Sequence, residues 1–351
     1  MSTPLPKLSY VLLSHNREKY IRAAIESAFA QDYEGELEYI FSDDCSTDRT
    51  FEIIKECVAG YKGNRRVVVT QTPRNLHLAG NTNHAVQFVE SDWIVRADDD
   101  DYSSIDRCTL IGQAIAAHPR ARYVTTGVVH FTDEEDSAIW SRSTATRAEQ
   151  PELIETSIST HSSQETAFRS RHLSYKAWHM DVFREFGPLH QQGYYVDDLT
   201  CFYRASILGT GVHIPNCIAV FMRDGSGNMS RGGDDNQRGF HAIMRLERFN
   251  DKYYNITHTP MCELQTALLS YIRERNLQHT ESFMLALEQE MQKRVLLCSF
   301  WRKGILNRIL VSRALGYRGI FSAMRCLPMP AFACLLHVYR MFKHAFKHTK
   351  T

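Results

Sequence analysis

The sequence predicts an α/β protein whose mostly parallel β-sheet carries helices on both faces. Two observations support this fold class. Short apolar runs alternate with longer segments of helical periodicity through the first hundred residues, as they do where crossover helices join parallel strands. Polar clusters stand directly after the apolar runs, at the strand ends where ligands bind in such sheets.

The elements of the first half follow in regular order. The predicted strands are 8–13, 37–41, 67–69 and 93–95, and the predicted helices between them are 17–30, 49–59 and 79–89. Polar residues follow the strands at 14–16, 43–48, 73–75 and 98–101. A single such residue is often only a helix cap, but clusters at four strand ends indicate one crevice.

The second half is less regular. A strand is predicted at 123–131, a polar stretch at 132–149 and a helix at 177–185, and the pattern after residue 238 is helical with a break at Pro328 and Pro330. We therefore expect an α/β domain over 1–235, in halves 1–101 and 102–235, and a helical C-terminal region over 236–351.

Composition is that of a soluble globular protein, with 43% hydrophobic and 23% charged residues. The nine cysteines are odd in number and never spaced as CxxC, which favours free thiols over a disulfide framework or a zinc site. The first residues show no charged region followed by a long apolar one, so no secretory signal is expected. The expected location is the cytoplasm.

The C-terminal region is basic from residue 291. Residues 291–351 hold twelve of the 41 basic residues and none of the 40 acidic ones, which leaves a net charge of −11 on the first 290. Its aromatic and basic residues predict contact with an anionic membrane surface, without a run long enough to cross it. Packing on the acidic body or in a homo-oligomer is the main alternative. Nucleic acid is not expected as a partner, because no zinc or RNA-recognition motif accompanies the charge.

Asp98, Asp99, Asp100 and Asp101 follow a predicted strand directly. Four adjacent negative charges are costly unless something positive offsets them, and Mg²⁺ or Mn²⁺ prefers such oxygen ligands. Alternation along an extended segment places Asp98 and Asp100 on one side, as the pair of metal ligands. A solvated acidic turn is the alternative.

Asp197 and Asp198 form a second acidic pair beside aromatic and apolar residues. Desolvation raises the pKa of a carboxyl group, which would suit one of them to accept a proton from a sugar hydroxyl. A helix N-cap followed by a first-turn aspartate explains the local sequence equally well.

Five motifs in the order found here resemble family 2 of the glycosyltransferases, which have the GT-A fold. They are YVLLSHNREKYIRAAIESAFAQDY, FSDDCSTDRT, PRNLHLAGNTNHAV, WIVRADDDDY and YYVDDLTCFYRA. The resemblance spans about residues 8–225, and the order of the motifs is far more specific than any one of them.

The resemblance implies a role for each matched residue. Asp98 and Asp100 would hold the metal that bridges the donor diphosphate, and Asp198 would be the catalytic base, supported by Asp197 and Arg204. Asp43 would recognise the nucleotide base. The other residues expected to bind the nucleotide sugar are Ser14, Asn16, Glu18, Asp44, Asn75, Asn83 and Asp99.

The chain departs from the family pattern at several positions. Leu13 and His15 stand where Pro and Tyr are usual, Cys45 and His77 stand where Gly is common, and Asp197 replaces Glu. Separately, Arg223 and Arg231 in the segment 221–233 could close over the phosphates as a mobile loop, although an exposed Gly-rich loop explains that segment as well.

The function expected is an inverting transfer of a sugar from a nucleotide-diphosphate donor, expected to be a UDP-sugar, to a hydroxyl of a glycan or lipid-linked acceptor in bacterial surface polysaccharide synthesis. The protein would be cytoplasmic or peripheral on the cytoplasmic face of the membrane. Two alternatives stay open: a metal-dependent nucleotidyltransferase, which would release pyrophosphate, and a non-catalytic nucleotide-sugar binder.

Overall fold

The structure is a computed structural model. It describes residues 4–133, 139, 151–156, 176–189, 197–224, 268, 270–275 and 285. All of these except residue 285 belong to one compact unit, formed by 1–225 and 268–284. The predicted domain boundary at 235/236 and the basic segment 291–351 lie outside the described residues.

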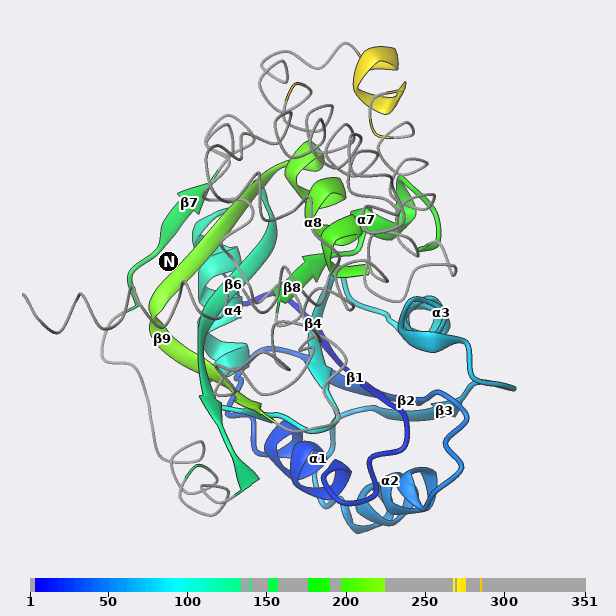
Figure 1. The fold of residues 1–351 in the computed structure, drawn as a ribbon. Coiled ribbons are helices and arrows are strands. Elements are labelled where there is room, and N and C mark those ends of the chain that lie inside the picture. The colour runs from blue at the N-terminus through cyan, green and yellow to red at the C-terminus, as the bar shows by residue number, and fades with distance from the viewer. Residues whose placement is uncertain are drawn as a thin grey trace, which may run out of the picture. The chain divides into compact units, whose positions relative to one another are not determined.

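The described part of the chain contains one nine-stranded sheet with the order β3-β2-β1-β4-β8-β6-β9-β5, and β7 pairs with β9 (Figure 1). The first four strands are parallel: β1 (Leu8–Ser14), β2 (Leu37–Asp43), β3 (Val67–Gln71) and β4 (Trp93–Asp98). The others are β5 (Tyr102–Ser103), β6 (Ala121–Phe131), β7 (Ile154–Thr156), β8 (Lys176–His179) and β9 (Thr210–Arg223). Strand β8 runs antiparallel between β4 and β6, and β6 pairs with β9 in parallel. The predicted α/β class with a mostly parallel sheet is confirmed.

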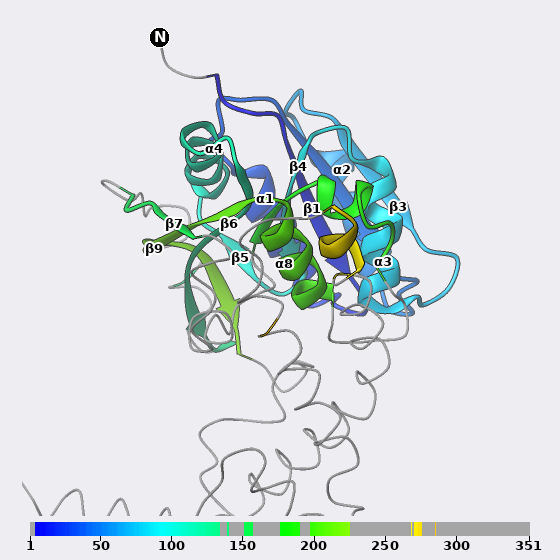
Figure 2. The same ribbon diagram turned by 90° about the horizontal axis from the view of Figure 1, so that it is seen from above.

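Helices cover both faces of this sheet (Figure 2). They are α1 (Ile21–Phe29), α2 (Thr50–Gly60), α3 (His77–Ala85) with the 3₁₀ turn η1 (Val86–Phe88), α4 (Arg107–Ala117), α7 (Asp181–Arg184) and α8 (Asp197–Leu208). Helices α1, α2 and α4 share one hydrophobic core with the sheet, and α3 and α8 lie on the opposite face. None of the helices described combines the length and the apolar character that crossing a bilayer needs.

Strands β1 and β2 are buried along their whole length, which explains why most of their residues are apolar. Tyr10 and Leu12 of β1 belong with Phe41 of β2 to the core that also contains Ile25 of α1. The opposite face is partly polar, because Ser42 of β2 hydrogen-bonds the amide of Asn81 on α3. The two faces therefore hold their helices by different chemistry.

One predicted element is wrong in part. Residues 177–185 were expected to form a helix, but the first of them belong to strand β8 and only Asp181–Arg184 form the short helix α7. Strand β8 lies between two others with Lys176, Ala177 and Trp178 all buried, so it shows no two-residue alternation. Helix α4 and strands β5, β7 and β9 were not predicted.

Candidate active site

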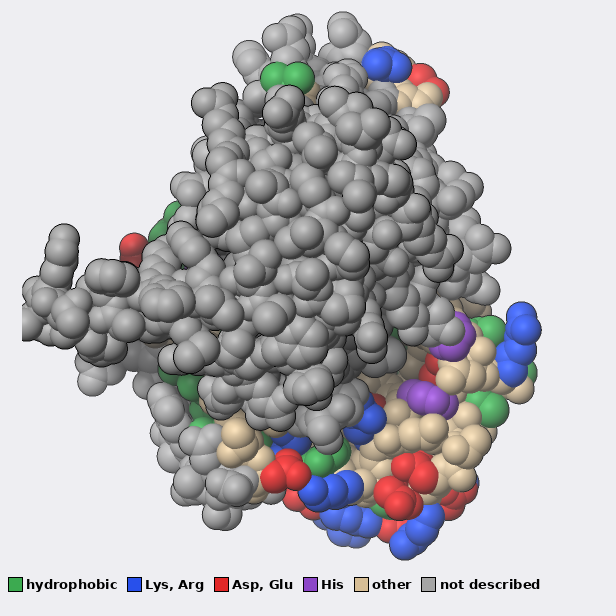
Figure 3. All heavy atoms as spheres, viewed as in Figure 1, with side chains coloured by type: hydrophobic (Ala, Val, Ile, Leu, Met, Phe, Trp, Pro, Cys, Tyr) green, Lys and Arg blue, Asp and Glu red, His purple; other side chains and the backbone are tan. Residues whose placement is uncertain are grey.

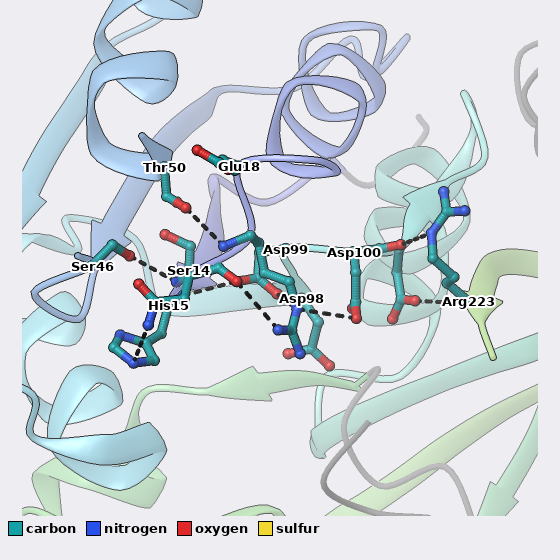
Figure 4. Close-up of polar contacts among 12 residues, drawn as sticks. Ser14, His15, Glu18, Ser46, Thr50, Asp98, Asp99, Asp100 and Arg223 are labelled. Carbon is teal, nitrogen blue, oxygen red and sulfur yellow. Dashed lines mark hydrogen bonds and ion pairs between the residues drawn. The ribbon is translucent and has the colours of Figure 1, made fainter. Parts of the chain in front are cut away.

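Three turns meet at the carboxyl ends of β1, β2 and β4, as Figure 4 shows. The backbone N–H of His15 donates to Asp99 Oδ2 at 2.8 Å, which joins the turn after β1 to the acidic turn after β4. The ring Nδ1 of His15 lies 2.8 Å from the carbonyl oxygen of Asp44, in the turn after β2. His15 thus connects all three turns, so the polar clusters that follow these strands lie close together.

The buried side chain of Asp43 holds the turn after β2 by hydrogen bonds. Its side chain is fully buried, and Oδ1 accepts from the hydroxyl groups of Ser14 and Ser46. Its Oδ2 accepts from the backbone of Ser46 at 2.9 Å and from the Gln71 amide at 2.8 Å. These four donors match the acceptor capacity of a carboxylate. The base contact expected of Asp43 stays a prediction that would require one donor to be released.

Asn16 and Cys45 adopt a left-handed backbone with φ of 54° each, and His77 has φ of 61°. Glycine is the residue best suited to this conformation, and asparagine is the best tolerated of the others. The family motifs carry Asn at the first position and Gly at the other two. The left-handed backbone is therefore present at these three positions, although the side chains of Cys45 and His77 disfavour it.

Two predicted donor-binding residues fix the turns to each other. The Oδ1 atom of Asn16 accepts from the backbone N–H of Thr47 at 2.8 Å. Glu18 Oε2 accepts from the backbone N–H of Arg49 at 3.1 Å, while Asp48 Oδ2 accepts from the backbone N–H of Glu18. These contacts hold the starts of α1 and α2 together.

The side chain of Asn75 contacts that of His15 beside the three turns. Asn75 Nδ2 lies 3.0 Å from His15 Nε2, and the Asn75 side chain is exposed. Asp44 is buried and accepts from Thr72 Oγ1 and from the backbone N–H of Leu76, both at 2.8 Å. Asp44 therefore holds the loop that carries Asn75.

Each residue of the acidic turn has an arginine nearby. Arg96 pairs with Asp98 at 2.9 Å, and Arg17 Nε lies 3.6 Å from Asp99 and 3.4 Å from Asp100. Asp101 accepts from the backbone N–H of Arg223 at 2.7 Å. The protein itself thus supplies part of the positive charge that these aspartates call for, through the guanidinium groups of Arg96 and Arg17, and the expected metal stays a prediction.

The pKa values of the Asp99 and Asp100 carboxyl groups are nevertheless raised. Burial raises the pKa of Asp99 well above its ordinary value, the neighbouring charge of Asp100 adds to the rise, and Arg17 opposes it. The pKa of Asp100 is raised by burial and by Asp98, and is lowered by Arg17 and Arg223. The ionised forms of both carboxyl groups are therefore disfavoured in the folded protein, and a cation bound to them would favour these forms and lower both pKa values.

Arg223 does not belong to a mobile loop. It ends β9 with its side chain 3% exposed, and its guanidinium pairs with Asp133 at 2.7 Å and donates to the Tyr102 hydroxyl at 2.7 Å. Its Nε also donates to the backbone carbonyl of Asp100 at 3.1 Å. The expected closure over phosphates is corrected for Arg223, which anchors the acidic turn; Arg231 lies outside the described residues.

The acidic turn fits a divalent cation only in combination with a ligand that supplies further oxygen atoms. Among the described residues, no three or more His, Cys, Asp or Glu side chains form a group that could hold a metal. Mg²⁺ commonly takes one or two carboxylates and completes its shell with substrate phosphates. Asp98 and Asp100 would supply two carboxylates to that incomplete type of site.

Helix α8 begins at the predicted pair Asp197 and Asp198. The side chains of these two residues lie outside the described residues. From the same helix, buried Arg204 donates to the carbonyl groups of Val182 at 3.0 Å and Gly187 at 2.7 Å. Arg204 therefore ties α8 to the segment after β8, and the supporting role expected of it in catalysis stays a prediction.

Asn83 of α3 also contacts the segment after β8. Its Nδ2 donates to the carbonyl of Leu189 at 2.8 Å, and its Oδ1 accepts from the backbone N–H of Leu189 at 2.7 Å. Both polar groups of Asn83 are thereby used in a contact that links α3 to the segment near α8. Its expected donor contact stays a prediction.

Sequence reasoning did not identify Arg17, Arg96 or Gln71 as parts of this site. Arg96 stands two residues before Asp98, so the alternation of strand β4 could have placed them on one side. Arg17 and Gln71 carried no comparable signal, because their contacts depend on how the turns meet. Outside the site, acidic and basic side chains intermingle over α1 and α2 (Figure 3), where Arg22 pairs with Glu56.

The fold matches solved GT-A structures. Residues 1–349 of TarS from S. aureus, crystallised with UDP-GlcNAc, align with a TM-score of 0.55 and 16% identity over 95% of this chain and 92% of that one. The mannosyltransferase PcManGT from Pyrobaculum calidifontis, with GDP-Man and Mn²⁺, aligns with a TM-score of 0.54 and 14% identity over 99% and 84%. These likenesses show the fold alone, and they confirm the predicted GT-A class.

The family follows from the sequence comparisons. Residues 9–180 match the model of glycosyl transferase family 2, and this part of the chain belongs to that family. EpsE of Bacillus subtilis is 33% identical over 128 residues, which cover 36% of this chain and 45% of EpsE. The poly(ribitol-phosphate) beta-N-acetylglucosaminyltransferase TarS of Staphylococcus aureus is 33% identical over 98 residues, 27% of this chain and 16% of TarS. The matched segments span less than half of these relatives.

Proposed function

We propose that the protein transfers a sugar from a nucleotide-diphosphate donor to a hydroxyl group of a glycan or lipid-linked acceptor, with inversion at the anomeric carbon. The observation that carries this proposal is the contact of His15 with both Asp99 and Asp44, which brings the acidic turn to the turns after β1 and β2. In a family 2 domain, that arrangement supports a nucleotide pocket adjoining a metal-dependent phosphate site.

The residues divide into three proposed roles. Ser14, Asn16, Glu18, Asp43, Asp44, Asn75 and Asp99 build or line the donor pocket. Asp98 and Asp100 would hold Mn²⁺ or Mg²⁺, which when bound offsets the charge that develops on the departing diphosphate. Asp198, at the start of α8, would accept the proton of the acceptor hydroxyl.

Two relatives suggest the chemical class of the substrates. The structures of TarS with UDP-GlcNAc and of PcManGT with GDP-Man support a nucleotide sugar as donor. The name of TarS, a poly(ribitol-phosphate) beta-N-acetylglucosaminyltransferase, supports a polymer as acceptor. On this basis we propose a UDP-sugar as donor and synthesis of a bacterial surface polysaccharide as setting.

The test is a release assay with a panel of UDP- and GDP-sugars and Mn²⁺. A nucleoside diphosphate should be released in the presence of an acceptor, and pyrophosphate would indicate a nucleotidyltransferase instead. Asp198→Asn should retain donor binding but lose turnover by about 10²-fold or more, because a general base typically contributes 10²- to 10⁴-fold. Unchanged turnover would exclude Asp198 as the base.

Residues 291–351 are proposed to attach the protein to the cytoplasmic face of a membrane. This proposal is supported by their twelve basic and no acidic residues, interspersed with aromatic side chains. Flotation with anionic liposomes should succeed for the full chain and fail for a chain ending at residue 290. Equal flotation of the two forms would contradict the attachment and favour packing on the protein or in a homo-oligomer.

A further inference from the structure

Arg17 lies between the acidic turn and the turn after β1. Its Nε is 3.4 Å from Asp100 Oδ2 and 3.6 Å from Asp99 Oδ1, so a single guanidinium bridges two adjacent carboxylates. One of these two, Asp100, is a proposed metal ligand. Arg17 therefore supplies positive charge at the place where a divalent cation is expected.

The backbone of Arg17 is held independently of its side chain. Its N–H donates to Thr50 Oγ1 at 2.7 Å, and its carbonyl accepts from the N–H groups of Tyr20 at 2.9 Å and Ile21 at 3.0 Å. The guanidinium also donates to the Asn16 carbonyl at 3.3 Å, so a change of rotamer would break that contact while these backbone hydrogen bonds stay in place.

The three arginines of the acidic turn are not equivalent. The side chain of Arg96 is 4% exposed with a 2.9 Å ion pair, and that of Arg223 is 3% exposed with a 2.7 Å ion pair. Arg17 is 27% exposed, and its distances to the carboxylates are longer. Of the three, Arg17 has the most access to solvent and thus to an arriving ligand.

We propose that Arg17 is an internal counter-ion, which offsets the acidic turn in the free protein and transfers its guanidinium to the donor diphosphate when donor and cation bind together. This inference rests on the proposed function. A divalent cation arriving alone would meet carboxylates already paired with a positive charge. A diphosphate offers Arg17 an alternative partner, because guanidinium groups bind phosphate oxygens in a bidentate geometry.

The consequence is coupled binding. Cation affinity should be low in the absence of a nucleoside diphosphate and should rise when one is present, and by reciprocity the cation should raise nucleotide affinity by the same factor. Arg17 would thereby prevent the acidic turn from binding free cations that lead to no transfer.

The test measures bound Mn²⁺ by electron paramagnetic resonance on the full chain, without nucleotide and with UDP or GDP. In the unsubstituted protein, the better of the two nucleotides should tighten Mn²⁺ binding by about tenfold or more. Arg17→Gln should bind Mn²⁺ alone about tenfold more tightly, and the nucleotide should then add less. Arg17→Lys keeps the charge and should still resist Mn²⁺ alone. Arg22→Gln removes an exposed arginine paired with Glu56 and should behave as the unsubstituted protein.

Two results separate failure of this inference from failure of the proposed function. Equal Mn²⁺ affinity of Arg17→Gln and the unsubstituted protein without nucleotide would overturn the counter-ion role, while nucleoside diphosphate release from a sugar donor would leave the proposed function standing. Absence of Mn²⁺ binding in both proteins, even with UDP or GDP, would overturn the metal site and this inference together.

Discussion

Arg223 and Asp133 form an ion pair of 2.7 Å at the edge of the acidic turn, and the arginine side chain is almost completely buried while the aspartate is about half exposed. The same guanidinium donates to the buried Tyr102 hydroxyl and to the carbonyl of Asp100. One side chain thus connects the ends of β6 and β9 to the turn that carries the proposed metal ligands.

Replacement of Arg223 should therefore destabilise the protein. Arg223→Met should lower the free energy of unfolding by about 2–3 kcal/mol, because Tyr102 and the Asp100 carbonyl lose a buried donor. Urea unfolding measures the change. Arg184→Met is the matched control, since Arg184 pairs with Asp92 at the same 2.7 Å but both side chains are more than half exposed, and its loss should lie within about 1 kcal/mol. Equal losses would show that Arg223 has no anchoring role.

Cys45 combines a φ of 54° with a position where the family motif carries glycine. Cys45→Gly should raise the free energy of unfolding by about 0.5–1 kcal/mol, because relief of the left-handed strain outweighs the greater entropy of glycine in the unfolded chain. Thermal unfolding measures the shift. Cys57→Gly makes the same replacement inside helix α2, where it should destabilise by about 1 kcal/mol or more. The same sign for both variants would contradict the strain at Cys45.

The strands of the first half could be predicted because each is an apolar run that ends in a polar cluster. Strand β8 could not be predicted, because Lys176, Ala177 and Trp178 are all buried between two strands. Their order shows neither the two-residue period of a half-buried strand nor the period of a helix. The GT-A class and the family were predictable because ordered motifs survive even where Cys45 and His77 replace glycine. Those motifs fix the backbone of the turns rather than single contacts.

The electrostatics of the acidic turn could not be predicted in the same way. The four aspartates indicated a need for positive charge. The guanidinium groups of Arg17 and Arg223 that contact this turn come from residues far away in sequence, and the sequence does not show which arginines the fold places there. Asn83 illustrates the same limit. Its position in an Asn-rich motif suggested donor binding, which stays a prediction, but gave no sign of the contact that its side chain makes with the backbone of Leu189, far away in sequence.

The contact of Asn83 with Leu189 predicts a local effect of substitution. Asn83→Asp keeps the acceptor for the Leu189 N–H but sets a carboxylate oxygen against its carbonyl, at a cost of about 1–2 kcal/mol. Hydrogen exchange should become faster at the Leu189 amide. Gln113→Glu makes the same amide-to-carboxylate change at an exposed position of helix α4 and should leave that amide protected. Unchanged exchange in Asn83→Asp would show that the contact does not hold the segment.

His213 on β9 predicts a pH dependence of stability. Its Nδ1 lies 2.6 Å from the hydroxyl of Thr125, and burial lowers its pKa below the ordinary 6.5, with the charge of Lys176 adding to the effect. The unfolded chain therefore takes up a proton at higher pH than the folded protein. The contribution to stability is complete above about pH 6.5 and is lost as the pH falls toward the folded-state pKa.

Urea unfolding at pH 7, 6 and 5 should accordingly show a smaller loss of stability for His213→Asn than for the unsubstituted protein. Some loss should remain, because burial also lowers the pKa of His179, and the double variant should flatten the dependence further. If His213→Asn loses as much stability between pH 7 and pH 5 as the unsubstituted protein does, His213 is not the group that titrates in this window.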